Sequence, residues 1–181
     1  MIKIHDNTVP FHVQQHIYDF IVHSSFKVIG WDDRDDIKKH DLHSRWSIED
    51  LKNSKLYPYI EKLYSFDKFD KCIVNLTKPG DHYYTHAHGD NSHVILYYAN
   101  LEWRDEWAGE TMFYDHNRII KNSYQFTPGR LLEFDGSLPH SIRPQSFIGP
   151  HFRFTVSAFF TNDLCNKITY RNYRRNRSVG C

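Results

Sequence analysis

The sequence contains little cysteine, and the cysteines it has form no recognisable site. Cys72, Cys165 and Cys181 are widely spaced, with no CxxC pair. This spacing argues against a disulfide framework and a structural zinc site, and it favours a reducing compartment. Residues 1–6 are followed by no apolar run, so they do not resemble a secretory signal. No window approaches the roughly 20 apolar residues of a membrane span. We therefore expect a cytoplasmic protein with no membrane partner.

A strong charge of one sign is also missing. The 23 basic and 22 acidic residues give a formal net charge of +1, which predicts no general attraction to nucleic acid. There is no GxSxG, Cys/His or P-loop signature of nucleophilic or phosphate chemistry. Basic and aromatic residues interleave only in segment 170–177. We interpret this segment as a solvated tail rather than as a contact for acidic peptides or nucleic acid.

The length and the aromatic content indicate one well-packed domain. A chain of 181 residues can bury a sizeable core, and its 13 Phe, 12 Tyr and 4 Trp suit β-strands. We predict a single domain over residues 1–181, mainly β with flanking N-terminal helices. It divides into a helical buttress (1–70), a β core (71–161) and a basic tail (162–181).

The first 70 residues carry two helical patterns. Apolar residues at helical spacing predict a helix over 10–23. A strand is expected at 26–31, followed by a charged turn at 32–36. A second helix should begin near Ser47, where Ser47 and Asp50 can form a capping box, and continue with breaks to about Tyr64.

From residue 71 onward, short apolar runs alternate with turn residues. This pattern is typical of an all-β barrel or sandwich. The expected strands lie at 72–76, 82–88, 94–99, 110–114, 124–127, 131–134 and 153–160.

Histidine is the most over-represented residue, at 13 copies. Five of them fall in the N-terminal third and are expected to be ordinary surface residues: His5, His12, His16, His40 and His43.

Three residues further along can form a metal site. On a strand, residues i and i+2 point to the same side, so His88 and Asp90 can face a single ion. His140 follows a strand end and a tight turn, and it is the best-placed third ligand. Two histidines and one carboxylate suit non-haem Fe(II) and leave coordination positions open. We therefore predict His88, Asp90 and His140 as the catalytic metal ligands.

The register of this site has an alternative. His86 also lies two residues before His88, so His86, His88 and His140 could bind a metal as in a cupin. A cupin motif also requires a glutamate four or five residues after the second histidine, where this chain has Ser92 and His93. We therefore favour Asp90 and place His86 beside the metal ligands or on the substrate side.

The order of motifs after this site resembles a known family. The runs ILYYANLEW (95–103), AGET (108–111), PGRLLEFD (128–135) with Pro139-His140, and RFTV (153–156) are similar to the prolyl 4-hydroxylase-like branch of the 2-oxoglutarate- and Fe(II)-dependent oxygenases. The similarity covers about residues 70–160. It implies a double-stranded β-helix, the jelly-roll or cupin-like fold.

The resemblance also implies how the cosubstrate is bound. Arg153 lies where the family has a basic residue that binds the far carboxylate of 2-oxoglutarate, and arginine suits bidentate carboxylate recognition. Tyr98 matches a tyrosine that contacts the same carboxylate in some relatives. The 13 positions from His140 to Arg153 exceed the family spacing, so residues 146–150 should form a loop. Arg143 is the alternative carboxylate ligand.

The implied activity is that of a dioxygenase. With Fe(II) and 2-oxoglutarate, and with ascorbate as a further cofactor, such an enzyme hydroxylates a C–H bond and releases succinate and carbon dioxide. The expected substrate is a prolyl or other side chain of a peptide or protein, or a small molecule. Two alternatives remain open: a cupin-type metalloenzyme that does not use 2-oxoglutarate, and a non-enzymatic β-sandwich binding module.

Overall fold

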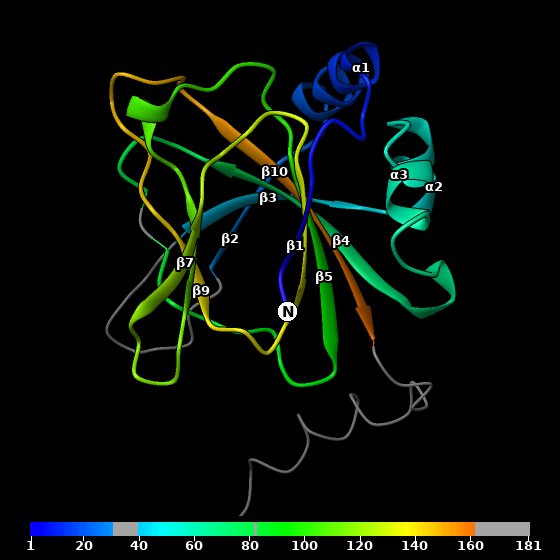
Figure 1. The fold of residues 1–181 in the computed structure, drawn as a ribbon. Helices are drawn as coiled ribbons and strands as arrows, with labels where there is room; N and C mark the ends of the chain where they lie inside the picture. The colour runs from blue at the N-terminus through cyan, green and yellow to red at the C-terminus, as the bar shows by residue number, and fades with distance from the viewer. Residues whose placement is uncertain (31–39, 82, 162–181) are drawn as a thin grey trace, which may run out of the picture.

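The protein is built around two antiparallel β-sheets (Figure 1). The computed structural model describes residues 1–30, 40–81 and 83–161. The predicted charged turn at 32–36 and the basic tail at 162–181 therefore lie outside the described residues. Within them, the chain has the mainly β character with N-terminal helices that the sequence predicts.

The larger sheet has seven strands in the order β1-β8-β5-β10-β4-β3-β2. Every neighbouring pair in it is antiparallel. The strands are β1 (Lys3–His5), β2 (Lys27–Gly30), β3 (His40–Trp46), β4 (Phe69–Thr77), β5 (Ser92–Tyr98), β8 (Leu131–Asp135) and β10 (Arg153–Thr161).

The smaller sheet has three strands in the order β7-β6-β9. They are β6 (Thr111–Tyr114), β7 (Ile120–Tyr124) and β9 (His140–Ile142). An isolated bridge between His86 and His140 adds the segment before β5 to this sheet. The two facing antiparallel sheets are those of a double-stranded β-helix, as the sequence predicts.

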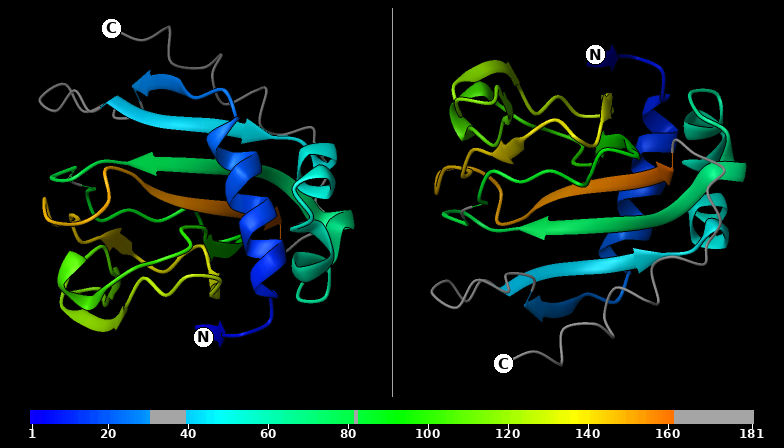
Figure 2. Two further views of the ribbon diagram at one scale, coloured as in Figure 1. Left: turned by 90° about the horizontal axis from the view of Figure 1, so that it is seen from above. Right: turned by 90° about the horizontal axis from the view of Figure 1, so that it is seen from below.

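Three helices cover the face of the larger sheet that points away from the smaller sheet (Figure 2). They are α1 (Phe11–Val22), α2 (Ile48–Asn53) and α3 (Tyr57–Glu61), and two short 3-10 turns follow at Phe66–Lys68 and Asp105–Trp107. The capping box of Ser47 and Asp50 is present. The expected long helix is broken at Lys55, which has a positive φ of 64°. No helix of the described part of the chain is long and apolar enough to cross a membrane.

Strand β10 separates two hydrophobic cores, because its residues alternate between the faces of the sheet. Phe154, Val156, Ala158 and Phe160 pack into the core under the helices. Phe159 belongs to the second core, between the two sheets. The even-numbered residues of this strand therefore hold the helices in place, and the odd-numbered ones face the space in which the candidate site lies.

Some strands differ from the sequence prediction. Strands β1, β3 and β9 were not predicted, and β7 spans 120–124 rather than 124–127. In place of the expected strand at 82–88, the described residues there form only an isolated bridge at His86. The residues of β7 are mostly exposed, and its central residues Lys121, Asn122 and Ser123 are polar. An edge strand of this kind lacks the apolar alternation on which strand prediction depends.

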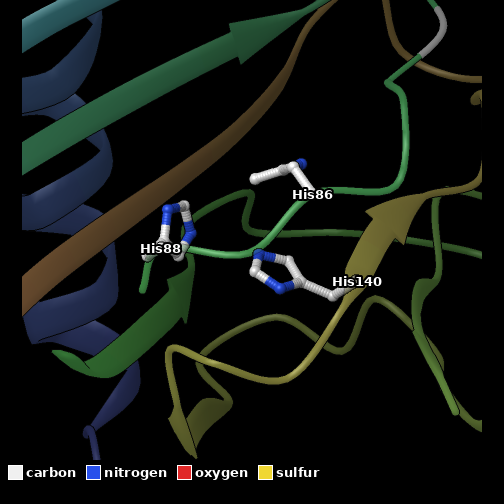
Figure 3. A group of neighbouring side chains, drawn as sticks. All are labelled: His86, His88 and His140. Carbon is white, nitrogen blue, oxygen red and sulfur yellow. The ribbon is translucent and has the colours of Figure 1, made fainter. Parts of the chain in front are cut away.

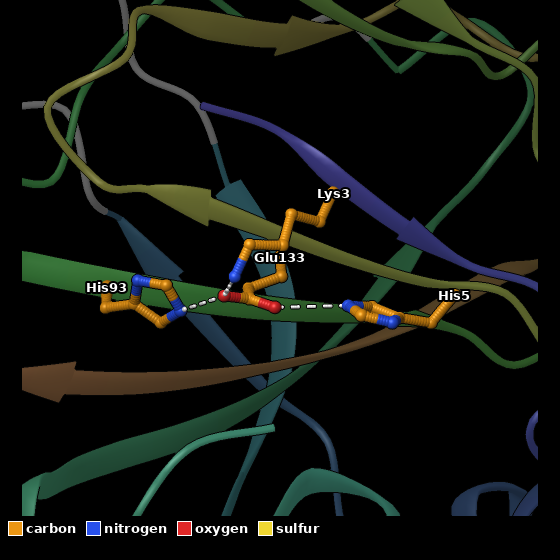
Figure 4. A network of polar contacts seen from close by, with 4 residues as sticks. All are labelled: Lys3, His5, His93 and Glu133. Carbon is orange, nitrogen blue, oxygen red and sulfur yellow. Dashed lines mark hydrogen bonds and ion pairs between the residues drawn. The ribbon is translucent and has the colours of Figure 1, made fainter. Parts of the chain in front are cut away.

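A buried carboxylate fastens the N-terminal strand to the larger sheet (Figure 4). Glu133 on β8 is 6% exposed. It accepts a hydrogen bond from Lys3 Nζ at 2.7 Å and contacts His5 Nε2 at 3.1 Å, and His93 Nε2 lies 3.4 Å away. Burial alone would raise the pKa of Glu133, but the contacts with Lys3 and His5 lower it below its ordinary value. His5 is therefore half-buried and structural, not the surface residue that was expected.

Replacing this carboxylate should loosen the N-terminal strand. We expect Glu133→Gln to lower the free energy of unfolding by about 1–2 kcal/mol, since Lys3 and His5 lose a charged acceptor in a buried position. Urea denaturation at pH 7 measures the change. The matched control is Glu102→Gln, because Glu102 pairs with Arg104 on an exposed surface and should change stability by less than about 0.5 kcal/mol. Equal effects of the two variants would contradict this role for Glu133.

Candidate active site

Backbone hydrogen bonds place three histidines at one end of the space between the sheets. The amide of His86 donates to the carbonyl of His140 at 3.0 Å, and the amide of His140 donates back at 2.9 Å. The amide of His88 donates to the carbonyl of Gly136 at 2.7 Å. Residues 86–88 are thereby attached to the chain on both sides of the turn that leads into β9.

The three imidazoles converge (Figure 3). One ligand atom from each of His86, His88 and His140 lies within 4.8 Å of the others, and their ring centroids are 4.5–5.0 Å apart. These separations allow all three nitrogens to bind one ion. Among the described residues, this is the one group of three or more His, Cys, Asp or Glu side chains that is arranged in this way.

Two of the rings are oriented by backbone carbonyls. Nδ1 of His140 contacts the carbonyl of Leu138 at 2.8 Å, and Nδ1 of His86 contacts the carbonyl of Tyr84 at 3.0 Å. Because a carbonyl can only accept, Nδ1 carries the proton in both contacts and Nε2 keeps its lone pair. Metal-binding histidines commonly have a hydrogen-bonded second nitrogen of this kind.

Burial keeps two of these imidazoles neutral. Although the residue as a whole is exposed, the His88 ring packs on Phe159 with centroids 4.8 Å apart, and this covers one side of it. Burial, reinforced by the neighbouring histidines, lowers the pKa of His88 to about 3. Burial lowers the pKa of His140 to about 4. Neutral imidazole is the form that binds a metal.

Asp90, which the sequence predicts as a metal ligand, is not among the side chains that converge here. The i, i+2 rule holds only while the chain stays extended, and Gly89 has a positive φ of 98°. The chain turns at residues 90–91, and Asp90 is exposed. The extended segment therefore brings His86 and His88, rather than His88 and Asp90, to the same side as His140.

The histidines line a pocket with a volume of about 370 Å³ between the two sheets. Its walls are largely apolar, with Ile73, Val94, Leu96, Phe134 and Phe159 among them. Polar side chains come from β4 and β10. They are Asn75, Thr155 and Ser157, and Asn75 Nδ2 donates to Ser157 Oγ at 3.3 Å. A pocket of this size and character can hold a small ligand.

His43 also lines this pocket, which corrects its assignment as a surface residue. It is 7% exposed and lies opposite Asn75 in the pairing of β3 with β4. Because β3 was not predicted, His43 was not assigned to the inward face of a strand. Alternation within residues 42–46, where Leu42, Ser44 and Trp46 share the other face, was the signal in the sequence.

Arg153 is a buried cation whose outer nitrogens have no protein partner. The residue is 1% exposed, and Nε donates to the carbonyl of Gly109 at 3.1 Å. Nη1 and Nη2 are buried and make no hydrogen bond within the described part of the chain. Burial lowers the pKa of Arg153 to about 10, so it is still charged at neutral pH. An unpaired buried guanidinium is costly, and an anionic ligand would relieve that cost.

Aromatic rings and a close backbone fix the position of this arginine. The guanidinium carbon lies 4.8 Å from the Phe126 ring centroid and 5.7 Å from that of Tyr98. A Cβ at residue 109 would lie 3.3 Å from Arg153 Cδ and 3.1 Å from Trp103. Glycine suits this position, because its φ of 85° is strained for other residues and a Cβ would require Trp103 or Arg153 to shift by a few tenths of an ångström.

The hydroxyl of Tyr98 already has a partner. Tyr98 is fully buried, and its hydroxyl donates to Thr111 Oγ1 at 2.7 Å. Burial raises its pKa to about 12. Thr111 itself lines the pocket, so Tyr98 reaches the pocket wall through this contact.

Arg143, the alternative carboxylate ligand, has a different environment. Its side chain is 60% exposed and pairs with Glu110 at 3.2 Å. The long spacing between His140 and Arg153 is taken up by a loop over 143–152, with a hydrogen bond from the amide of Gly149 to the carbonyl of Ser146 at 3.3 Å. The structure thus places Arg153, not Arg143, in a buried position with free donors.

Comparison with known proteins supports the fold alone. No protein-family model and no curated protein sequence matches the chain. Solved structures do match. A prolyl-4-hydroxylase from Pseudomonas putida has a TM-score of 0.63 at 16% identity, over 88% of this chain and 92% of that one. The chain has the fold of the 2-oxoglutarate- and Fe(II)-dependent oxygenases.

Two further structures agree. A prolyl hydroxylase from Trichoplax adhaerens, in complex with a peptide fragment of the hypoxia-inducible factor oxygen degradation domain, has a TM-score of 0.66 at 15% identity, over 89% of this chain and 83% of that one. A 2OG-Fe(II) oxygenase family oxidoreductase from Burkholderia pseudomallei has a TM-score of 0.66 at 10% identity, over 90% and 86%.

The lowered histidine pKa values predict acid sensitivity of the metal-free protein. Between about pH 6.5 and 4 the unfolded chain binds more protons than the folded one at His88 and His140, so stability falls as the pH falls. The melting temperature of the metal-free protein across this range measures the effect. In the double variant His88→Gln, His140→Gln, the melting temperature should change less steeply with pH. The control His12→Gln, on the exposed side of α1, should keep the pH dependence of the wild type. A wild-type slope that the double variant retains would contradict the prediction.

Proposed function

We propose that the protein is an Fe(II)- and 2-oxoglutarate-dependent dioxygenase that hydroxylates a C–H bond. The observation that carries this proposal is that the histidine cluster and Arg153 occur near the same pocket. Arg153 is a buried cation on the pocket-facing side of β10, and two of its donors have no partner. A metal site alone fits many proteins. A buried guanidinium without a carboxylate of its own fits a cosubstrate that brings one.

The proposed metal ligands are His86, His88 and His140. Their Nε2 or Nδ1 atoms converge, and two of the rings are fixed through Nδ1 by backbone carbonyls. Asp90, which the sequence suggested, is replaced by His86 in this proposal. Three imidazoles on one side of an ion leave its remaining positions open, and imidazole suits iron.

The proposed cosubstrate ligands are Arg153 and Tyr98. Arg153 can donate from Nη1 and Nη2 to the far carboxylate, with its guanidinium held by Phe126 and by the carbonyl of Gly109. Tyr98 orients Thr111 toward the pocket and contributes its ring beside the same cation. Thr155, on the same face of β10, lines the space between this arginine and the histidines.

These positions give the metal, the cosubstrate and the surrounding residues different roles in the proposed reaction. When bound, iron and 2-oxoglutarate supply the oxidation, which consumes dioxygen and yields succinate, carbon dioxide and a hydroxylated product. The histidines fix the metal, and Arg153 fixes the orientation of the cosubstrate. The apolar residues Val94, Leu96 and Phe134 exclude water from the reacting atoms. No protein nucleophile is required. Ascorbate would act as an auxiliary reductant.

The proposed substrate is a prolyl or other side chain of a peptide or protein. The support is analogy of fold with prolyl hydroxylases, one of which is bound to a peptide. Tyr83 and Tyr84 line the pocket, where their rings can pack against an apolar side chain.

One observation favours a second candidate, a metalloenzyme that does not use 2-oxoglutarate. His86, His88 and His140 are the three ligands expected of a cupin-type site, and the group includes no carboxylate. The two candidates differ at Arg153, which has a function in binding only if 2-oxoglutarate is the cosubstrate.

Metal binding tests the choice of ligands. We expect His86→Ala to weaken Fe(II) binding by at least about tenfold, because a site of three ligands loses one. Asp90→Ala should leave the affinity within about twofold. Anaerobic competition with a chelator measures both affinities. A larger loss of Fe(II) affinity in Asp90→Ala than in His86→Ala would show that the carboxylate is the ligand instead. If the wild type binds no iron, the non-enzymatic binding module would be favoured.

Cosubstrate binding tests the role of Arg153. Arg153→Gln should weaken binding of 2-oxoglutarate to the metal-loaded protein by about 10- to 100-fold, as expected for loss of about 1.5–3 kcal/mol from hydrogen bonds to a charged group. Arg143→Gln is the control, because Arg143 is exposed, and should change the affinity little. Calorimetry with Mn(II) in place of iron measures binding without turnover. Tight metal binding with no binding of 2-oxoglutarate would favour the second candidate.

A further inference from the structure

The pocket has an unusual balance of charge for the proposed reaction. Within the described residues, its lining contains four imidazoles but no aspartate or glutamate. Arg153 lies buried beside it with a positive charge. A divalent ion and Arg153 bring three positive charges, whereas a 2-oxoglutarate dianion brings two negative ones. With the metal and 2-oxoglutarate bound, the site therefore keeps a net positive charge. Because little water screens this charge inside the pocket, it attracts a further anion strongly.

Lys71 is a further basic residue near this pocket, on the same face of the sheet as two lining residues but outside the lining itself. It belongs to β4, where residues two apart share a face, so it follows Ile73 and Asn75 along the pocket side. Its Nζ lies 5.0 Å from the centroid of Phe159, and the same ring packs against His88. The ammonium group of Lys71 and the ring of His88 thus lie against the same phenylalanine, Phe159.

The two strands that neighbour β4 carry a basic residue and a hydroxyl on the same face of the sheet. Arg45 on β3 lies opposite Ile73 and has the same parity as His43, so it faces the pocket side of the sheet. Ser157 on β10 lies opposite Ile73 from the other side and lines the pocket. Lys71, Arg45 and Ser157 therefore lie on the same face of three adjacent strands, where Ser157 lines the pocket and Arg45 is exposed beside it.

The acidic residues near Lys71 do not cancel this charge. Asp70 Oδ2 is 3.8 Å from Lys71 Nζ, and the Asp70 side chain is 51% exposed. A long ion pair in water is weak. Asp90 is exposed and outside the histidine group. Glu110 is already paired with Arg143.

We propose that the substrate carries an anionic oxygen group, a carboxylate or a phosphate, that Lys71 binds next to the metal. This inference rests on the proposed function, and it specifies the substrate. The group belongs to the side chain that is hydroxylated or to its neighbour in the peptide. Arg45 and Ser157 provide further donors on the same wall, and Arg153 at the opposite end is reserved for the cosubstrate.

The test uses acetate and its neutral isostere acetamide, which differ in charge but hardly in size. Each is titrated into the protein loaded with Co(II) and 2-oxoglutarate, and the visible absorption of Co(II) reports ligands close to the metal. We expect acetate to bind at least about tenfold more tightly than acetamide. In Lys71→Gln the dissociation constant of acetate should rise about tenfold, because one nearby charge is removed.

Three matched variants sharpen the result. Lys71→Arg keeps the charge and should retain most of the acetate affinity. Lys62→Gln removes an exposed lysine from the end of α3 and should have no effect. His86→Asp adds a negative charge at the metal and should weaken acetate binding beyond the effect of Lys71→Gln. Equal affinities for acetate and acetamide, no saturation by acetate, or an unchanged affinity in Lys71→Gln would overturn the inference.

The loading steps separate this inference from the proposed function. Binding of Co(II) and then of 2-oxoglutarate is measured before either probe is added. If the protein binds both but does not distinguish acetate from acetamide, only the anionic substrate is excluded. If it fails to bind Co(II) or 2-oxoglutarate, the proposed function is excluded, and this inference with it.

Discussion

Two backbone hydrogen bonds between His86 and His140 determine the arrangement of the candidate site. They join a segment that precedes β5 to the first residue of β9, across about fifty positions of sequence. The side chains of both residues then lie on the same side, and His88 follows two positions further along the extended chain. The carbonyls of Tyr84 and Leu138 complete the arrangement, since they orient the two rings. The geometry of the cluster is therefore a property of the fold, and it does not depend on a carboxylate near the histidines.

Strand β10 relates this cluster to Arg153. Its even-numbered residues are buried under the helices, and its odd-numbered residues run from Arg153 at one end, past Thr155 and Ser157, to Phe159 beneath His88. The same alternation that packs the helical buttress therefore aligns a cation with the proposed metal ligands along one pocket. The burial of Arg153 is tolerable because Gly109 allows its carbonyl to approach and Phe126 covers the guanidinium. Its two free nitrogens are the strongest indication that a carboxylate ligand completes the site.

Much of the fold followed from the sequence, because the interior strands carry clear apolar patterns. Strands β4, β5, β8 and β10 lie close to where alternation and turn residues predicted them, and the capping box of Ser47 is present. The misses have physical reasons. β7 is an exposed polar edge, and β3 contains His43, which is polar yet lines the pocket. At the site, strand periodicity allowed either His86 or Asp90 to share a face with His88, and Asp90 was preferred because a carboxylate suits Fe(II) and the glutamate of a cupin motif is missing. Periodicity could not show that Gly89, with its positive φ, interrupts the extended chain between His88 and Asp90.

We propose that iron at the three histidines and 2-oxoglutarate at Arg153 occupy a single pocket. Anaerobic titration of the Fe(II)-loaded protein with 2-oxoglutarate, monitored by visible absorption, tests this arrangement. If the cosubstrate chelates the iron while Arg153 holds its far carboxylate, a charge-transfer band should appear and saturate at one equivalent. Arg153→Gln should then require far more 2-oxoglutarate to reach the same band. Bound iron that shows no such band at any concentration of 2-oxoglutarate would contradict the account.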